Sequence, residues 1–479
     1  MNFRPVFIVA LLASLLCDFG PGNVSPASLS FLSQIAYNAN GTYAPSTLPI
    51  WCVNSHTSNS TGAIPASQNV LLAKTTLGAT CLRTDANNWD QVEGSLGVYT
   101  WTNSDTYFNA ICAAAIHPIF VATYNNALYS SGIFTAITGG SNITGYSNFN
   151  VAAVNRLIGT NGCTNVIAEE FNEPNLTIWT TSTWNGYTYA GMLGTVSASI
   201  KTAQPGVKVS SGGVSPGPGT AANAWVSGLV GAGTTFTNVD YYGSHPYNYN
   251  IGTPALTPPC DQILLDVNYI SVAGGAISQG AAQVRPIAVT EYGVPWDGLG
   301  SSVTQAVLNL QGSCIGEAAL DSIIGGFAIF TPYDLIDDGI NYTLTDQNSF
   351  GLFFNGTATS GSPITGATAY GIKPAGTAYQ EVIACSANTT GYTASFNTTL
   401  SVETLTFSNG SGKCFAIWTF DATSTKSYSN TIGTFSSVTC KDLLGNSYTN
   451  TYSGGVLSMT IRTYTGSTGT GPAICTALN

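Results

Sequence analysis

Residues 165–175 have the sequence NVIAEEFNEPN, an apolar, strand-like run that passes into a polar turn carrying Glu173. Residues 286–293 have the sequence PIAVTEYG and place Glu291 at the end of a second run of the same kind. Acidic side chains are scarce, with 23 Asp and Glu among 479 residues. Two glutamates at strand ends are therefore not explained by solubility, and their spacing constrains the fold.

Apolar, strand-like segments alternate with amphipathic, helix-like segments along most of the chain. We expect strands at residues 49–54, 80–84, 117–124, 166–172, 207–212, 239–245, 286–291 and 323–330, and helices at residues 68–77, 107–115, 186–201, 222–230 and 306–321. Eight alternations over about 300 residues are typical of a (β/α)8 barrel, the TIM barrel of the α/β class. An open, doubly wound sheet is the alternative, but no Gly-x-Gly-x-x-Gly turn follows an early strand.

The spacing of the two glutamates independently supports the barrel. Residue 291 lies 118 positions after residue 173, which corresponds to three strand–helix units of about 40 residues each. Glu173 then ends the fourth strand and Glu291 ends the seventh. Both ends lie on the C-terminal face of a barrel, where barrel active sites are built.

A pair of carboxyl groups on rigid strands is what glycoside cleavage requires, because one protonates the leaving oxygen while the other attacks the sugar or activates water. Other strands end in polar residues too: Arg83 ends the second, Asn172 the fourth, and His245 and Tyr247 the sixth. A cation beside a nucleophilic carboxylate keeps that carboxylate ionised. An amide next to the first glutamate is suited to bond the 2-hydroxyl group of a sugar.

The motifs resemble those of the clan A retaining glycoside hydrolases, namely Arg83, Asn172-Glu173-Pro174, His245-x-Tyr247 and Glu291. Within this (β/α)8 superfamily, the Asn-Glu-Pro-Asn turn and the trailing β-domain are most similar to family 39 and to family 5-like members. The resemblance covers roughly residues 49–383. It implies a retaining β-glycosidase in which Glu173 is the acid/base and Glu291 the nucleophile. Their carboxyl groups are then expected about 5–5.5 Å apart.

One position departs from the pattern of the clan. Its members often carry a tryptophan at the end of the eighth strand, in the floor of the −1 subsite, whereas residues 326–331 here have the sequence GFAIFT. We expect Phe330 to take the place of that ring. Tyr124, which ends the third strand, and Trp296 are further candidate sugar contacts.

Each candidate also has a purely structural interpretation. The two glutamates would then be ordinary cap or loop acids, Arg83 would pair with Glu169, and His245 would be a satisfied core histidine. Tyr247, Tyr124 and Trp296 would be packing residues. For the whole protein, the alternatives are a catalytically inactive glycan-binding barrel and a structural surface glycoprotein, which the ten Asn-x-Ser/Thr sequons would suit.

The chain divides into four parts. Residues 1–22 combine one positive charge, a short apolar run and a Gly/Pro-rich exit, as in a secretory signal peptide. Residues 23–48 form a segment that we expect to pack on the C-terminal domain, and residues 49–383 form the barrel. Residues 384–479 alternate polar with apolar or β-branched positions between Gly, Asn and Ser turns, which predicts an all-β, sandwich-like domain.

Cysteine usage fits a secreted chain. Eleven cysteines minus Cys17 leave ten, six before residue 320 and four after residue 384, which predicts disulfides within each of two domains. A lipoprotein anchored at Cys17 is the alternative, but Leu16 is a poor residue before a lipidated cysteine. No Cys-x-x-Cys pair occurs and the chain has only three histidines, so we expect neither a metal nor an organic cofactor.

Charge is sparse and negative. Asp, Glu, Lys and Arg make up 7% of the chain, against roughly 25% in ordinary globular domains, and the net charge is −11. Twelve Lys and Arg residues do not form the basic surface that nucleic acids or strongly anionic polymers need. We therefore expect a monomer that acts on a neutral polysaccharide or oligosaccharide and spans no membrane. Glucan, mannan, xylan and galactan all stay open as substrates.

Overall fold

The computed structural model describes residues 47–59, 62–176, 184–215, 225–226, 228–229, 231, 237–247, 285–295, 304–339, 348–358, 367–397, 400, 402–419, 424–462 and 471–479. These residues form two compact units, one within residues 47–384 and one from residue 385 to residue 479. The predicted signal peptide and almost all of the predicted segment 23–48 lie outside the described residues.

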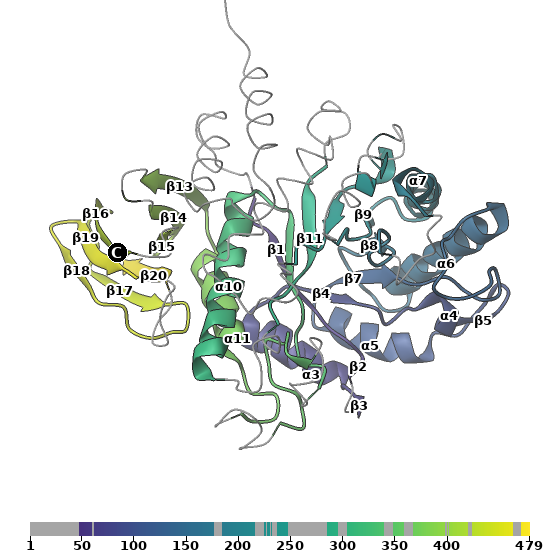
Figure 1. Ribbon diagram of the computed structural model, residues 1–479, viewed down its shortest axis with the longest axis horizontal. Coiled ribbons are helices and arrows are strands. Elements are labelled where there is room, and N and C mark those ends of the chain that lie inside the picture. The colour runs from purple at the N-terminus through teal and green to yellow at the C-terminus, as the bar shows by residue number, and fades with distance from the viewer. Residues whose placement is uncertain are drawn as a thin grey trace, which may run out of the picture. The chain divides into compact units, whose positions relative to one another are not determined.

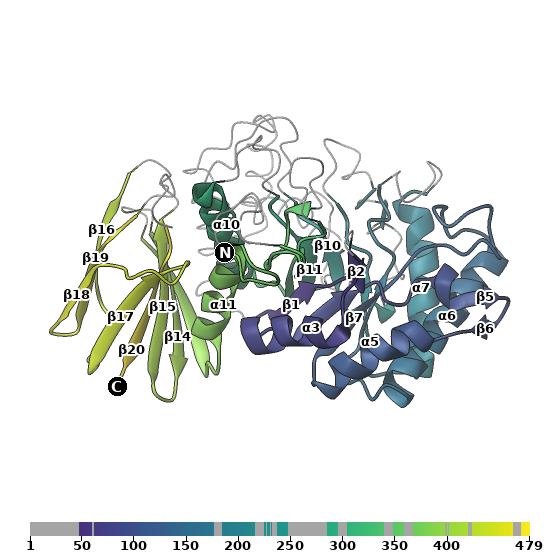
Figure 2. The same ribbon diagram turned by 90° about the horizontal axis from the view of Figure 1, so that it is seen from below.

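Eight parallel strands form the larger unit (Figures 1 and 2): β1 (Ile50–Asn54), β4 (Cys81–Thr84), β7 (His117–Ala122), β8 (Ile167–Glu170), β9 (Lys208–Ser211), β10 (Tyr242–Ser244), β11 (Ile287–Tyr292) and β12 (Ile329–Pro332). Hydrogen-bonded neighbours run in the order β10-β11-β12-β1-β4-β7-β8-β9. Parallel bridges from Ser210 to Tyr241 and from Val214 to Ser244 join β9 to β10. The sheet is therefore a nearly closed barrel, and the predicted (β/α)8 fold is confirmed.

The interior of the barrel changes from apolar to polar along the strands, because successive residues of a strand point alternately inward and outward. One buried layer consists of small or apolar side chains: Cys52, Cys81, Ile119, Ile167, Ala288 and Ile329. Two residues further along β1, β4 and β8 the interior carries Asn54, Arg83 and Glu169, all buried. The polar layer thus lies at the C-terminal ends of the strands.

Helices follow most of the strands: α3 (Ala66–Val70) with the π-helix η1 (Leu71–Leu77), α4 (Trp89–Val92), α5 (Thr102–Ala113), α6 (Gly140–Gly159), α7 (Gly186–Ala203), α10 (Gln305–Ile324) and α11 (Pro374–Ser386). The predicted helices at 68–77, 107–115, 186–201 and 306–321 correspond to α3–η1, α5, α7 and α10. Most of the predicted helix at 222–230 lies outside the described residues. Two small hairpins, β2 (Ser58–Asn59) with β3 (Gly62–Ala63) and β5 (Glu93–Ser95) with β6 (Val98–Tyr99), lie in the first two strand–helix connections.

Three features differ from the prediction. The helices α6 and α11 were not predicted; α6 begins with Gly140-Ser141-Asn142, residues of low helix propensity, and is held by buried side chains such as Phe149 and Leu157. The eighth strand was predicted at 323–330 but begins at Ile329, because residues 323 and 324 end α10. Gly326, with φ of 66°, lies in the turn between the helix and the strand.

The smaller unit is all β, as predicted. Its antiparallel strands are β13 (Gly391–Asn397), β14 (Val402–Asn409), β15 (Gly412–Thr419), β16 (Lys426–Thr431), β17 (Ser437–Asp442), β18 (Asn450–Ser453), β19 (Val456–Ile461) and β20 (Ala473–Leu478). They form a sheet in the order β13-β14-β15-β20-β17 and a second sheet in the order β16-β19-β18. Phe415 and Cys475 of the first sheet share one buried cluster with Tyr428 and Leu457 of the second, so the two sheets pack as a sandwich.

Between cysteines that are both described, four disulfides form: Cys52–Cys81 and Cys112–Cys163 in the barrel, and Cys385–Cys414 and Cys440–Cys475 in the sandwich. For these pairs the predicted division into two groups is confirmed, and such bonds are consistent with an oxidising compartment. Within the described part of the chain, no helix has both the length and the apolar character that crossing a bilayer requires.

Candidate active site

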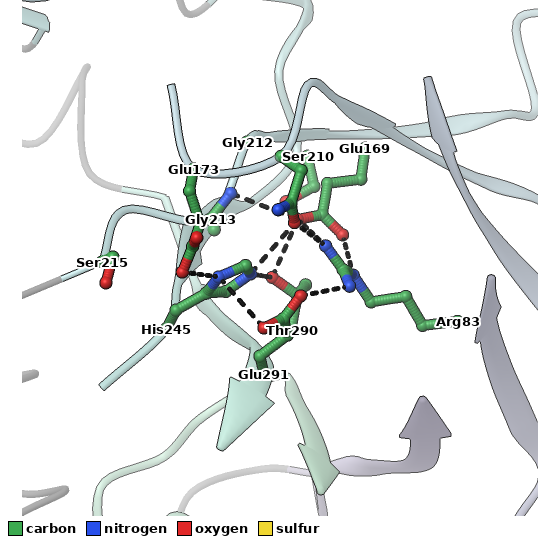
Figure 3. A network of polar contacts seen from close by, with 12 residues as sticks. Arg83, Glu169, Glu173, Ser210, Gly212, Gly213, Ser215, His245, Thr290 and Glu291 are labelled. Carbon is green, nitrogen blue, oxygen red and sulfur yellow. Dashed lines mark hydrogen bonds and ion pairs between the residues drawn. The ribbon is translucent and has the colours of Figure 1, made fainter. Parts of the chain in front are cut away.

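The C-terminal ends of four strands bring together polar residues that are far apart in the sequence (Figure 3). Arg83 lies on β4, Glu169 on β8 and Glu291 on β11, and their side chains converge in the barrel interior. Glu173 follows β8 after a short turn, and His245 directly follows β10. Glu173 is half-buried and the other four are buried. The structure therefore brings together the predicted catalytic pair and the predicted cation.

Arg83 has a partner for each of its five N–H groups. Its Nε and Nη2 donate to the two carboxylate oxygens of Glu169, over 2.5 and 3.0 Å. The other three hydrogens go to Glu291 Oε1 at 2.6 Å, Asn54 Oδ1 at 2.8 Å and Asn172 Oδ1 at 2.9 Å. Burial alone would lower the pKa of Arg83, but the carboxylates of Glu169 and Glu291 raise it above its usual value. Arg83 thus pairs structurally with Glu169 and also orients Glu291.

Glu169 is a buried anion that connects several parts of the site. Besides Arg83, the backbone N–H of Gly213 and the hydroxyl of Thr290 donate to its Oε1, over 3.1 and 3.0 Å. Burial would raise the pKa of Glu169, but Arg83 and His245 lower it to about 2. Glu169 therefore stays charged and fixes the orientation of Arg83.

Glu291 has a donor on each carboxylate oxygen. Oε1 accepts from Arg83 at 2.6 Å, and Oε2 accepts from the hydroxyl of Tyr247 at 2.5 Å. His245 Nδ1 is 3.5 Å from Oε2. These contacts hold the carboxylate in one orientation at the mouth of the barrel.

Glu173 reaches the same space from an unusual backbone conformation. Phe171 and Glu173 have φ values of 77° and 45°, in the left-handed region that side chains rarely adopt. The turn brings Glu173 Oε1 to 3.1 Å from His245 Nδ1. One carboxylate oxygen of Glu173, one of Glu291 and one ring nitrogen of His245 all lie within 4.8 Å of one another. Backbone strain of this kind tends to occur at functional sites, where the surrounding structure maintains it.

The surroundings of His245 favour a proton on both ring nitrogens. Its Nε2 is 3.1 Å from the hydroxyl oxygen of Thr290, whose own hydrogen goes to Glu169, so Nε2 is the donor. Its Nδ1 faces Glu173 and Glu291. Burial would lower the pKa of His245, but Glu291 and its neighbours Glu169 and Glu173 raise it to about 9.

Gly213 makes room for the imidazole. A β-carbon at this position would lie 2.0 Å from His245 Nε2. A glycine is therefore needed for His245 to pack directly on the backbone that also donates to Glu169.

The structure also locates the other predicted contacts. Asn172 is bonded through its Oδ1 to Arg83, and Tyr247 is bonded to Glu291. Tyr124 makes a hydrogen bond with Asn172 and packs edge to face on Phe171. Trp296 lies outside the described residues.

The prediction for Phe330 is wrong. Its side chain is fully buried and packs against Trp51, Tyr292 and Tyr379. Tyr379 belongs to α11, so Phe330 points outward to the helices while its neighbour Ile329 fills the barrel interior.

Tyr333 is the aromatic residue that lies beside the site beyond the end of β12. Its ring centroid is 6.3 Å from that of Tyr247, and its hydroxyl is 3.2 Å from Nε2 of His56. Tyr333 was not predicted as a site residue because the eighth strand was predicted too early. Asn54 and Thr290 were not predicted either. Both are polar residues at or near the end of a strand, the same criterion that identified Arg83.

Comparisons with known proteins support the fold assignment. No protein-family model matches the chain, and neither does any curated protein. Among solved structures, a family 39 glycoside hydrolase from Bacteroides cellulosilyticus WH2 is 19% identical, with a TM-score of 0.63 over 90% of this chain and 81% of that one. The family 51 α-L-arabinofuranosidase AbfB from Bifidobacterium longum is 11% identical, with a TM-score of 0.61 over 92% and 98% of the two chains. The fold is that of the clan A glycoside hydrolases.

A third similar structure shows how widely the sugar varies on this fold. It is a 4-O-α-L-rhamnosyl-β-D-glucuronidase from Fusarium oxysporum 12S, 13% identical, with a TM-score of 0.56 over 91% of this chain and 97% of that one. The clan A fold thus leaves the sugar undetermined, and the side chains around the two glutamates have to decide it.

Proposed function

We propose that this protein is a secreted retaining β-glycosidase, which hydrolyses O-glycosidic bonds of a neutral polysaccharide or oligosaccharide by double displacement. The observation that carries the proposal is the pair formed by Glu173 and Glu291, whose carboxylate oxygens approach to within 4.8 Å. Retaining enzymes hold their two carboxyl groups about 5–5.5 Å apart, whereas inverting enzymes leave about 6.5–9.5 Å for a water molecule. The short separation supports retention.

In the first step Glu291 attacks the anomeric carbon of the sugar. A bond forms between that carbon and a carboxylate oxygen of Glu291, and the bond from the carbon to the leaving oxygen breaks. Glu173 gives its proton to the leaving oxygen, so the released group departs as an alcohol. Arg83 and Tyr247 hold Glu291 in place for this attack.

In the second step a water molecule attacks the anomeric carbon of the glycosyl-enzyme. Glu173, now a carboxylate, takes one proton from the water, and the ester bond to Glu291 breaks. Both glutamates return to their starting states. No metal or organic cofactor enters either step.

His245 is placed to exchange a proton with Glu173. Below the pKa of His245, about 9, its Nδ1 carries a proton and lies 3.1 Å from Oε1 of Glu173, which can take up that proton. Glu173 in its neutral form then donates to the leaving oxygen. The neighbouring hydroxyl of Thr290 orients the ring through Nε2.

The two alternatives explain less. A glycan-binding barrel or a structural glycoprotein has no need to bury Arg83, Glu169 and His245 around a strained turn, because burying charges is costly unless all are paired. For secretion, the support is the predicted signal peptide at residues 1–22 together with the disulfides in both units. The predicted domain limits, 49–383 and 384–479, are part of the proposal, as is the monomeric state.

The test is covalent labelling with 2-deoxy-2-fluoro glycosides of the gluco, manno, xylo and galacto series, followed by peptide mass spectrometry. We expect an adduct on Glu291 and on no other residue, and the sugar that labels names the −1 specificity. Glu173→Gln should lose activity on glycosides with poor leaving groups but retain it on activated ones, which need no acid. Glu170→Gln is the matched control, since Glu170 points away from the site. A folded protein that none of these sugars labels would favour the glycan-binding alternative.

A further inference from the structure

A second group of polar side chains lies beside the catalytic pair, and we call it the His56 cluster: His56, Asp85, Tyr333, Asp334 and Asp338. His56 follows β1, Asp85 follows β4, and the other three follow β12. The strands β12, β1 and β4 are neighbours in the barrel. All five residues therefore lie on the same C-terminal face as Glu291.

The imidazole of His56 is the centre of the cluster. Its Nδ1 is 3.7 Å from Asp85 Oδ1, and its Nε2 is 3.9 Å from Asp334 Oδ2 and 3.2 Å from the hydroxyl of Tyr333. One oxygen each of Asp334 and Asp338 and one nitrogen of His56 lie within 4.8 Å of one another. Three carboxyl groups thus surround one imidazole.

The cluster adjoins the nucleophile. The ring of Tyr333 is 6.3 Å from the ring of Tyr247, and the hydroxyl of Tyr247 donates to Glu291. A sugar ring whose anomeric carbon lies at Glu291 would therefore have the His56 cluster beside it.

Asp334 has an acceptor atom that no protein donor satisfies. Its side chain is 2% exposed, yet its Oδ1 has no hydrogen-bond partner. A buried polar atom without a partner is costly, which indicates that a ligand group such as a hydroxyl pairs with it. The side chain of Asp85, which is 43% exposed, offers a second acceptor at the entrance.

The cluster sets three carboxyl groups against one imidazole. Burial would lower the pKa of His56, but Asp85, Asp338 and Asp334 raise it to about 10. Burial and the charge of Asp338 raise the pKa of Asp334 well above its usual value. A further anion placed here would meet repulsion.

The described part of the barrel offers no free cation to offset that repulsion. Arg83 uses all five N–H groups, and both nitrogens of His245 and of His56 face partners. Lys373 is fully buried and bonded to Asp337. The remaining barrel cations lie on helices or at the N-terminal ends of strands: Lys74, Arg156, Lys201, Lys208 and Arg285.

We propose that the His56 cluster selects the sugar at the cleavage point by charge, accepting hydrogen bonds from the hydroxyl groups of a neutral glycone and rejecting a glycone that carries a carboxylate. The inference rests on the proposed glycosidase function and names the class of sugar that the site takes. Two anions brought together in a cleft repel strongly, and such repulsion is an effective means of specificity. A structure with a similar fold is named as a glucuronidase, so the fold by itself does not exclude a carboxylate and side chains have to make the distinction.

The experiment compares matched pairs of nitrophenyl glycosides that differ only at C6: β-glucoside with β-glucuronide and β-galactoside with β-galacturonide. For a pair whose neutral member is cleaved, we expect the neutral substrate to have a kcat/KM on the order of 100-fold higher, as several kcal/mol of like-charge repulsion would produce. Xylosides and mannosides establish whether the enzyme is active when neither pair is a substrate.

Two kinds of variant should shift this ratio in opposite directions. Asp338→Asn and Asp85→Asn each remove a negative charge. Each should lower the ratio of kcat/KM for the neutral glycoside to kcat/KM for the uronide by about 10-fold, the effect of about one lost charge interaction. His56→Gln removes the positive charge and should raise the same ratio. Asp90→Asn, which removes the same charge from α4, is the matched control and should leave the ratio unchanged. Melting temperatures check that each variant folds.

Several results would overturn the charge selection. If the wild-type protein cleaves the uronide at the same rate as the neutral glycoside, the charge selection is wrong but the glycosidase function stands. Variants that slow both substrates equally would show that the cluster is only structural, and a stoichiometric Ca²⁺ or Zn²⁺ retained by the purified protein and lost in His56→Gln would make it a metal site. If no glycoside is cleaved, the proposed function fails, and binding of glucose, galactose or xylose but not of their uronates, measured by calorimetry, decides the selection by itself.

Discussion

Glu169 and Glu170 are adjacent in β8 and both fully buried, but their surroundings are opposite. Glu169 points into the barrel, where Arg83 and other donors saturate it, and its pKa is lowered to about 2 despite burial. Glu170 points to the helices, where neither carboxyl oxygen has a hydrogen-bond partner, and burial raises its pKa to about 8. One step along a strand therefore separates a permanent anion from a neutral acid.

The difference arises from what each side of the sheet contains. On the outer side, the hydroxyls of Tyr146 and Tyr189 lie against β8 but donate to the backbone carbonyls of Ala122 and Glu170. No cation of the described residues lies there to pair with the carboxyl group of Glu170. The inner side concentrates charges that stabilise one another, and the outer side stabilises only the uncharged form.

The largest effect on stability should come from removing the charge of Glu169 on the inner side of the sheet. Glu169→Gln leaves Arg83 buried without its main counter-charge, which typically costs about 3–5 kcal/mol of unfolding free energy. Activity should fall as well, because Arg83 and Thr290 lose the group that orients them. Chemical denaturation and kcat measure the two effects. A variant as stable as the wild type would mean that the charge of Glu169 is not what holds the interior together.

An intermediate effect should follow from crowding the inner side without changing its charge. Gly213→Ala places a β-carbon against the ring of His245, and a displacement of about 1 Å at a catalytic group can cost on the order of 100-fold in rate. We expect kcat to fall by about 10- to 100-fold with the protein still folded. Gly191→Ala is the matched control, because on α7 the new β-carbon meets no atom within 4 Å. Equal activities of the two variants would contradict the role given to Gly213.

The smallest expected effect comes from Glu170 on the outer side, where a substitution should raise the unfolding free energy instead of lowering it. The pKa of Glu170 is about 8 in the folded protein, above its usual value of 4.5, so folding is progressively disfavoured as pH rises between these two values. Glu170→Gln has no proton to lose and should become the more stable protein, by about 1–2 kcal/mol at pH 8 and by little at pH 4.5. Unfolding free energies measured across this pH range test the prediction. Parallel curves for variant and wild type would refute it.

Much of the architecture could be predicted because the barrel repeats one simple pattern. Eight apolar runs indicated the eight strands, and polar residues at or just after the strand ends indicated Arg83, Glu173, His245 and Glu291. The helix α6 was missed because tertiary packing overrides its weak local propensity. The error at Phe330 arose because an apolar segment continues from the end of α10 into β12, and periodicity alone does not locate the boundary between them.

The charge states of Glu169 and Glu170 and the His56 cluster could not be predicted from the sequence, for a different reason. The opposite states of Glu169 and Glu170 depend on which side of β8 each residue faces, and both have the same letter in the sequence. The His56 cluster joins residues from three connections that are far apart in the chain, at positions 56, 85 and 333–338. No sequence period links them, so only the closure of the barrel reveals them as neighbours.

Arg83 has a consequence for how the protein becomes active during biosynthesis. Its guanidinium group draws its partners from β1, β8 and β11 while it sits on β4, so the first, second, fourth and seventh strands meet at one side chain. A nascent chain that has not yet released residue 291 lacks the carboxylate that Arg83 orients. A chain whose seventh strand has not docked therefore lacks a complete site, because Arg83 and Glu291 meet only when the barrel has formed.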